Sequence, residues 1–96
     1  MNFQFHPEAE IELNEAISYY EKIDKGLGFD FAIEANLANQ RALFLPKAWA
    51  EIDVNIRRSL LARFPYGIVY TETDKEIYIL AVMNLHRQPN YWKHRS

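Results

Sequence analysis

The sequence predicts an α+β fold in which a helical hairpin packs on one face of a small, mostly antiparallel sheet. In the first half of the chain, apolar residues recur at intervals of three and four, which is typical of helices, whereas in the second half they alternate as in strands. With 96 residues, of which 49% are hydrophobic, the chain is long enough for one core. We therefore expect a single domain over residues 1–96.

The first half of the chain predicts a strand followed by two helices. Residues 1–5 contain the alternating "FQF", and Pro7 can open a helix because its fixed φ suits a first turn. Apolar positions keep one helical face through residues 7–24, and the glycines of "DKGLG" then break the helix. A second helix is predicted over residues 29–45, and the alanines of its apolar face let a neighbouring helix approach closely. The two helices should therefore form an antiparallel hairpin.

Residues 50–84 predict antiparallel strands. The stretch "IRRSLLARF" alternates, "PYG" is a turn signal, and "IVYTET" is rich in strand-forming residues. The run "EIYILAVM" is apolar at nearly every position, as in a central strand that is covered on both faces. The predicted order is β-α-α-β-β-β, followed by a C-terminal tail over residues 85–96. In that tail Trp92 should anchor the segment on the sheet, and Arg95 should matter least.

One face of this sheet should stay free of the helices, and it is the predicted functional surface. Arg57 and Arg63 occupy the more polar set of alternate positions in "IRRSLLARF". We therefore expect both guanidinium groups to point away from the helical layer. The tail would add His86, Arg87 and Tyr91 to the same surface, where another macromolecule could contact them.

The charge of the chain is distributed unevenly. Its net charge is −2, but residues 1–48 hold eight acidic and four basic side chains, whereas residues 49–96 hold seven basic and five acidic ones. The first half is therefore net −4 and the second half net +2. Any attraction to a polyanion would come from the second half.

Several classes of site are not predicted. The sequence has no cysteine, which excludes disulfides and cysteine-based zinc sites. Its three histidines are dispersed, and no glycine-rich phosphate loop follows a strand, so we predict no metal and no cofactor. No segment approaches the length of a membrane span, and the first ten residues lack the pattern of a signal peptide. We expect a cytoplasmic protein that does not enter membranes.

The basic and aromatic residues of the second half allow two kinds of chemistry. Cleavage of an RNA backbone needs no metal if a site offers a proton acceptor, cations and an acid. Arg57, Arg63 and Arg87 could bind phosphate, and His86 or Tyr91 could transfer protons, with histidine better matched to neutral pH. The alternative is that the arginines form a solvated face or meet an acidic partner peptide.

Four stretches of the chain resemble one protein family. They are "FHPEAEIELNEAISYYE", "GLGFDF", "IRRSLLARFPYGIVY" and "IYILAVMNLHRQPNYWKHR", which together cover nearly the whole chain. They resemble the RelE/ParE superfamily of type II toxin–antitoxin toxins, on the ParE-like plasmid-stabilisation branch. The specific parts are "RFPYGIVY" with its upstream basic pair and the terminal "HRQPNYW". The resemblance implies the same β-α-α-β-β-β fold.

The resemblance also implies a function and partners. The chain would be a growth-inhibiting toxin that a cognate antitoxin neutralises by wrapping a flexible segment over its surface. Antitoxins of this kind are commonly acidic where they bind, which would suit Arg57, Arg63 and Arg87. The complex could be a toxin–antitoxin hetero-oligomer, and the toxin itself could form a homodimer.

The superfamily divides between poisoning of DNA gyrase and ribosome-dependent cleavage of messenger RNA. RelE-like endoribonucleases tend to be strongly basic, whereas this chain has a net charge of −2, so we favour a toxin that binds gyrase. On this branch a histidine often follows the "ILAV" strand, where this chain has Asn84 and then His86. The alternatives are the endoribonuclease and a non-toxic, degenerate member that still binds antitoxin.

Overall fold

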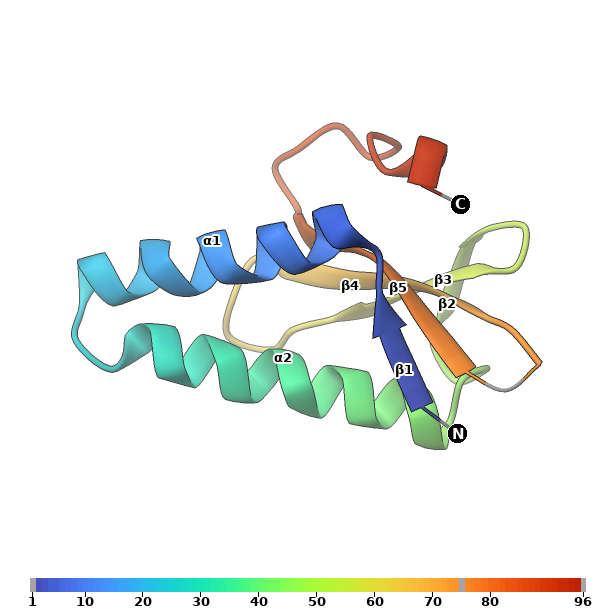
Figure 1. The fold of residues 1–96 in the computed structure, drawn as a ribbon, viewed down its shortest axis with the longest axis horizontal. Coiled ribbons are helices and arrows are strands. Elements are labelled where there is room, and N and C mark those ends of the chain that lie inside the picture. Colours follow the sequence, from blue (N-terminus) through green and yellow to red (C-terminus); the bar gives the residue numbers. More distant parts are fainter. Residues whose placement is uncertain (1, 75, 96) are drawn as a thin grey trace.

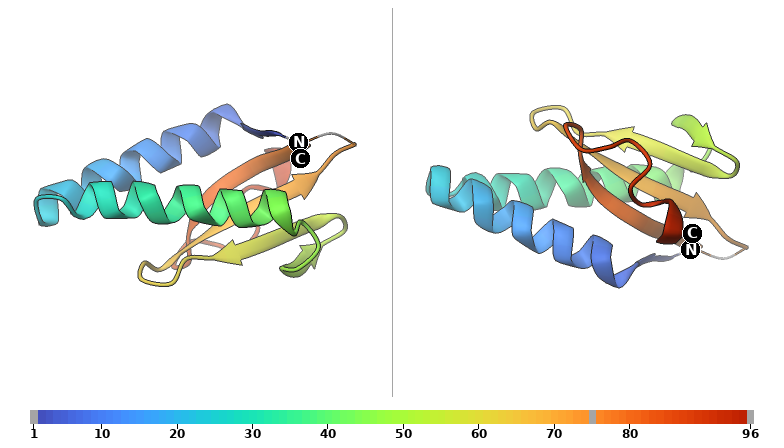
Figure 2. Two further views of the ribbon diagram at one scale, coloured as in Figure 1. Left: turned by 90° about the horizontal axis from the view of Figure 1, so that it is seen from below. Right: turned by 90° about the horizontal axis from the view of Figure 1, so that it is seen from above.

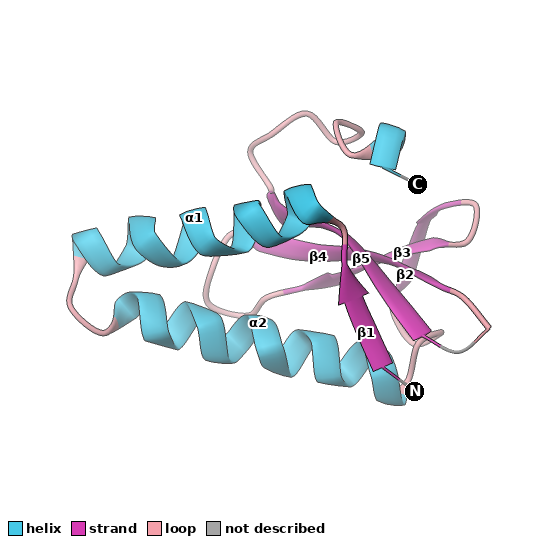
Figure 3. Cartoon of the chain, viewed as in Figure 1, coloured by secondary structure: helices cyan, strands magenta, loops and turns pink. Residues whose placement is uncertain are grey.

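The computed structural model confirms the predicted fold class and adds one strand (Figures 1 and 3). It describes residues 2–74 and 76–95, so the outer ends of the predicted first strand and tail, and one residue of the predicted strand region, lie outside the described residues. Its elements are β1 (Asn2–Phe5), α1 (Pro7–Ile23), α2 (Leu27–Phe44), β2 (Ala50–Asp53), β3 (Ile56–Leu60), β4 (Tyr66–Glu72), β5 (Glu76–Asn84) and the 3-10 turn η1 (Lys93–Arg95).

The five strands form one mixed sheet in the order β1-β5-β4-β3-β2. β1 pairs in parallel with β5, and all other pairs are antiparallel. Sequence reasoning did not separate β2 because its four residues, "AEID", show too short a pattern. The helices lie together on one side of the sheet, as Figures 1 and 2 show. None of the helices in the described part of the chain combines the length and apolar character needed to cross a membrane.

Local signals fix the start of the helical hairpin and the turn between its helices. Pro7 opens α1, and the Nδ1 atom of His6 accepts a hydrogen bond of 3.1 Å from the backbone N–H of Glu8. At the turn Gly26 has a φ of 90°, which favours glycine. A Cβ on Gly28 would lie 2.5 Å from the carbonyl oxygen of Ile17, so α1 and α2 need a glycine where they approach each other.

The main core lies between the hairpin and the sheet. The alanines of both helix seams are buried there, and an aromatic cluster packs beside them. Within the cluster, the ring centres of Phe31 and Phe64 are 5.0 Å apart and those of Phe31 and Tyr66 are 4.9 Å apart, both in edge-on geometry. The side chains from the sheet that complete this core include Ile68, Tyr70, Ile77, Ile79 and Val82.

The other face of the sheet is covered by the tail rather than left open. Trp92 is 1% exposed and packs on a second cluster formed by Ile56, Val69, Leu80, Ala81 and Met83. The burial of Trp92 confirms that it anchors the tail. The face that the sequence predicted to be free is therefore partly occupied by the chain's own C-terminal segment, as Figure 2 shows from above.

A β-bulge in β5 brings two neighbouring residues of this strand into the second cluster. Val69 pairs with Ala81, but the next residue, Tyr70, pairs with Ile79, so Leu80 is an extra residue in β5. The bulge turns Leu80 and Ala81 toward the same side, where both contact the tail cluster.

Candidate functional site

The edge of β5 next to β1 is open along half of its length. β1 pairs with β5 only as far as Ile79, because the chain then leaves the sheet to form α1. The side chain of Glu12 on α1 takes the place of the missing strand by accepting a hydrogen bond of 3.1 Å from the backbone N–H of Val82. Arg95 takes the same role for the carbonyl oxygen of Leu80, to which its Nη1 donates at 3.0 Å. These two side chains therefore satisfy backbone groups that would otherwise remain unpaired.

Glu12 and Arg95 are also bound to each other. Nη1 of Arg95 lies 2.9 Å from Oε1 of Glu12, and Nη2 lies 3.1 Å from Oε2, which is a two-pronged ion pair. The side chain of Glu12 is 12% exposed and that of Arg95 is 5% exposed. The expectation that Arg95 matters least is wrong, because its guanidinium group links the tail to both α1 and β5.

Arg87 lies beside this pair and remains accessible. Its guanidinium carbon is 3.8 Å from the centre of the Tyr91 ring, and its Nη1 is 3.4 Å from Oε2 of Glu12. About half of the Arg87 side chain, 53%, is exposed. The ring and the carboxylate therefore fix the direction of this cation without covering it.

The two candidates for proton transfer differ in exposure: Tyr91 is partly buried and His86 is exposed. Burial raises the pKa of Tyr91 well above its usual range, and the adjacent Glu12 carboxylate adds to the effect. The direction of this shift disfavours Tyr91 as a proton acceptor. His86 lies in the exposed start of the tail, where its backbone N–H donates to Oδ1 of Asn84 at 2.9 Å. The catalytic roles of both residues stay predictions.

A groove of about 340 Å³ runs between α1 and the adjoining ends of β4 and β5. Two tyrosine rings and aliphatic side chains form its apolar part, and carboxylates, an amide and one guanidinium group form its polar part. The residues that line it are Glu12, Glu15, Ala16, Tyr19, Tyr66, Val82, Asn84 and Arg87. Of the three arginines that the sequence selected, Arg87 is the one that lines this groove, which we take as the candidate functional site.

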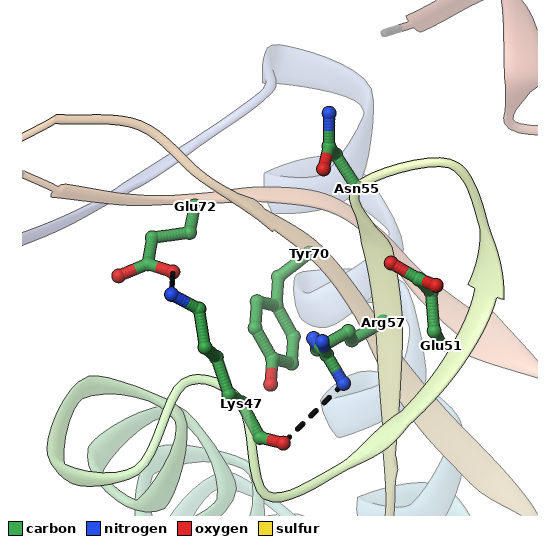
Figure 4. A pocket seen from close by; sticks show the side chains of 6 residues that line it. All are labelled: Lys47, Glu51, Asn55, Arg57, Tyr70 and Glu72. Atoms are coloured by element: carbon green, nitrogen blue, oxygen red, sulfur yellow. Dashed lines mark hydrogen bonds and ion pairs between the residues drawn. The ribbon is translucent and has the colours of Figure 1, made fainter.

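Arg57 does not lie on the face of the sheet that carries the tail. It pairs with Tyr70 across β3 and β4, and so it shares the face of the helical core. Its Nη1 donates to the carbonyl oxygen of Lys47 at 3.3 Å (Figure 4). The same atom donates to the carbonyl oxygen of Trp49 at 2.7 Å, and the two bonds tie β3 to the segment after α2. The surrounding pocket, of about 150 Å³, is lined by Lys47, Glu51, Asn55, Arg57, Tyr70 and Glu72.

Arg63 is not part of a strand. β3 ends at Leu60, and the loop that follows turns Phe64 back into the helical core. Nε of Arg63 lies 3.3 Å from Oε1 of Glu34 on α2, and a second carboxylate, that of Asp30, lies 3.8 Å from its Nη2. The predicted common surface of Arg57, Arg63 and Arg87 is therefore wrong. Arg57 lies on the face of the helical core, and for Arg63 the alternation was extended past the true end of the strand.

Sequence reasoning missed two features of the site. Glu12 was not selected, because its contact with Arg95 joins positions 83 residues apart, which no local pattern reveals. Arg58 was not selected, although alternation in β3 places it with Ile56 on the face that carries the tail. In residues 2–74 and 76–95, no three histidine, aspartate or glutamate side chains are grouped to hold a metal ion.

Comparison with known proteins identifies the class of fold. No family model and no curated protein matches the sequence. Among solved structures, a chain of the "Chromosomal ParDE TA system from P. aeruginosa" superimposes with a TM-score of 0.70 and 16% sequence identity. The match covers 90% of this chain and 97% of the other chain. The chain therefore has the fold of ParE-like toxins, as its sequence resemblance predicted.

Proposed function

We propose that this protein is the toxin of a type II toxin–antitoxin system and that a cognate antitoxin neutralises it. The observation that carries the proposal is the likeness of nearly the whole chain to a chain from a ParDE system, without a large insertion or missing element. The sequence motifs "RFPYGIVY" and "HRQPNYW" resemble the same family, which makes the structural likeness more informative than a shared fold alone.

The toxin acts by binding a protein target, DNA gyrase, through the groove and Arg87. Tyr19 and Tyr66 supply large apolar surfaces in the groove, and Arg87 supplies a charge whose orientation is already fixed by Tyr91. Aromatic rings and arginine are the residues that most often dominate binding energy at protein interfaces. Little side-chain entropy is lost when such a prearranged group binds.

Binding is favoured over RNA cleavage because neither of the two predicted proton-transfer residues, His86 and Tyr91, is among the described residues that line the groove. The pKa of Tyr91 is raised by burial and by Glu12, and His86 is not among the lining residues. Glu12 and Glu15 also place two carboxylates in the groove, where they would repel a phosphate backbone. The endoribonuclease remains the alternative function.

The antitoxin is expected to compete for the same groove. A segment that places an apolar side chain between the two tyrosine rings and a carboxylate on Arg87 would match its chemistry. Such binding would be neutralising because target and antitoxin would use overlapping groups. The cellular location implied by these partners is the cytoplasm.

The experiment is a gyrase supercoiling assay with the purified protein and with Arg87→Ala. We expect the parent protein to inhibit supercoiling and Arg87→Ala to do so at least about tenfold less well, since truncation of an arginine that dominates an interface costs about 2 kcal/mol or more. Lys25→Ala removes an equal charge from the exposed turn between the helices and should inhibit like the parent. Circular dichroism should show that all three proteins are folded.

Three other results would distinguish the gyrase target from the endoribonuclease and from the non-toxic member of the family. Normal supercoiling at a large molar excess of protein would overturn the gyrase target. If growth nevertheless stops on expression and mapping of messenger ends reveals new cuts, the protein is an endoribonuclease. If growth is unaffected but the product of a neighbouring short gene binds the protein, it is a non-toxic member of the family.

A further inference from the structure

The outer face of α2 exposes a stripe of large apolar side chains. Phe29, Ile33, Leu37 and Phe44 are 68%, 45%, 50% and 82% exposed, respectively. At 100° per residue they fall within an arc of about 80°, directly opposite the buried alanines of the same helix. Figure 2, seen from below, shows α2 as the front of the molecule with no other element over it. We name these four residues the α2 stripe.

We propose that the α2 stripe is the interface of a homodimer in which α2 packs antiparallel against α2 of a second copy. The proposal is independent of the proposed toxin function, because the groove lies on the other side of α1. The size of the stripe supports it: at these exposures the four side chains offer on the order of 450 Å² per copy, or about 900 Å² in a symmetric pair. An area of this size fits a weak but specific dimer rather than a permanent one.

The order of residues in the stripe suits a two-fold axis. Aromatic rings stand at its two ends and aliphatic side chains lie between them, so reversing the helix places Phe29 opposite Phe44 of the second copy. The midpoint then falls between Asn36 and Leu37. Each copy would present the same surface to the other, which is the requirement for a closed dimer.

Charges beside the stripe complement each other in this arrangement. Asp30 and Arg41 are eleven residues apart, close to three turns, and so they lie on the same flank of the stripe. In the antiparallel pair Arg41 of the second copy lies about 3 Å along the axis from Asp30, at a rise of 1.5 Å per residue. A parallel two-fold pair would instead place Asp30 of one copy and Arg41 of the other on opposite flanks and about 16 Å apart along the axis, so the opposite charges meet only in the antiparallel pair.

The test measures the oligomeric state of the full chain by sedimentation equilibrium over a concentration series. We expect the parent protein to dimerise with a Kd on the order of 10 µM. Leu37→Lys places two like charges at the two-fold axis and should raise Kd at least about tenfold. Ile11→Lys makes the equivalent change on the outer face of α1 and should leave Kd within about twofold of the parent.

A charge exchange tests the antiparallel register. Arg41→Glu and Asp30→Lys should each raise Kd about threefold or more, and the double variant should restore it to within about twofold of the parent. Because the chain has no cysteine, Leu37→Cys should also give a disulfide-linked dimer on mild oxidation, whereas Ile11→Cys should not. A parent protein that is monomeric at several hundred micromolar, or a Leu37→Lys variant that dimerises equally well, would overturn the proposal even if another protein binds α2.

Discussion

The tail and the outer face of α2 lie on opposite flanks of the molecule (Figure 1). Large apolar side chains are buried on the tail flank and exposed on the α2 flank. On the tail flank, Trp92 is buried against the sheet, and Arg95 and Arg87 are held by carboxylates and a tyrosine ring. On the α2 flank, Phe29 and Phe44 point into solvent. The tail covers the second face of the sheet, whereas no element in residues 2–74 and 76–95 covers the outer face of α2.

The difference shows which surface the fold needs and which it leaves for other molecules. A small sheet with two apolar faces needs a cover on both. In this chain of 96 residues the helices cover one face and the tail covers the other. The α2 stripe is not needed for folding, because α2 already buries a complete alanine seam. Substitutions on the tail flank should therefore change stability, and substitutions on the α2 stripe should change association.

The largest expected effect on stability is that of Trp92→Ala. Removing an indole ring that is 1% exposed leaves a cavity between the tail and the sheet, and we expect a loss of about 4 kcal/mol in the free energy of unfolding. The measurement is urea denaturation followed by circular dichroism. Phe44→Ala removes an aromatic ring that is 82% exposed and should cost less than about 0.5 kcal/mol at concentrations where the protein is monomeric. Equal losses in the two variants would contradict the contrast between the flanks.

The next effect is that of the ion pair that ties the tail to α1. Glu12→Ala should cost about 3 kcal/mol because it leaves Arg95 without its partner and the backbone N–H of Val82 without an acceptor. A double variant with Arg95→Ala should cost clearly less than the sum of the two single changes, since the two groups interact directly. Glu15→Ala, an exposed carboxylate one turn further along α1, is the control and should stay within about 0.5 kcal/mol of the parent. Additive single losses would show that the pair contributes little.

Much of the fold could be predicted from the sequence because local signals agreed with one another. Pro7 marks the start of α1 and Gly26 precedes the start of α2, and the alanine seam of α2 identifies the face that packs on α1 and the sheet. The apolar run of β5 indicated a central strand, and β5 does lie between two other strands. β2 was missed because it has four residues and carries no clear alternation.

The candidate site could be predicted only in part. Alternation at two-residue spacing gives the face of a side chain only while the strand continues, and β3 ends three residues before Arg63. Arg57 was assigned to the wrong face because both sets of positions in β3 contain an arginine, so polarity alone did not distinguish them. The roles of Glu12 and Arg95 depend on where β1 ends beside β5, which is a property of the assembled sheet.

The smallest effect concerns how α2 is held to the rest of the molecule beneath its apolar stripe. Burial acts to raise the pKa of Glu34, but hydrogen bonds from the backbone N–H groups of Arg63 and Ala62, together with the Arg63 side chain, lower it overall. A carboxyl whose pKa is lowered in the folded state stabilises the protein fully above the pKa of the unfolded chain, about 4.3, and this stabilisation is lost as the pH falls through the folded-state value.

Glu34→Gln should therefore cost about 1 to 2 kcal/mol at pH 7 and progressively less below about pH 4.5, where the parent loses the same charge. The measurement is the free energy of unfolding of both proteins between pH 7 and pH 3, with Glu10→Gln on the exposed face of α1 as the control for loss of one carboxylate. If the difference between parent and Glu34→Gln stayed constant over this range, the ionised carboxylate would not be what joins α2 to the loop after β3.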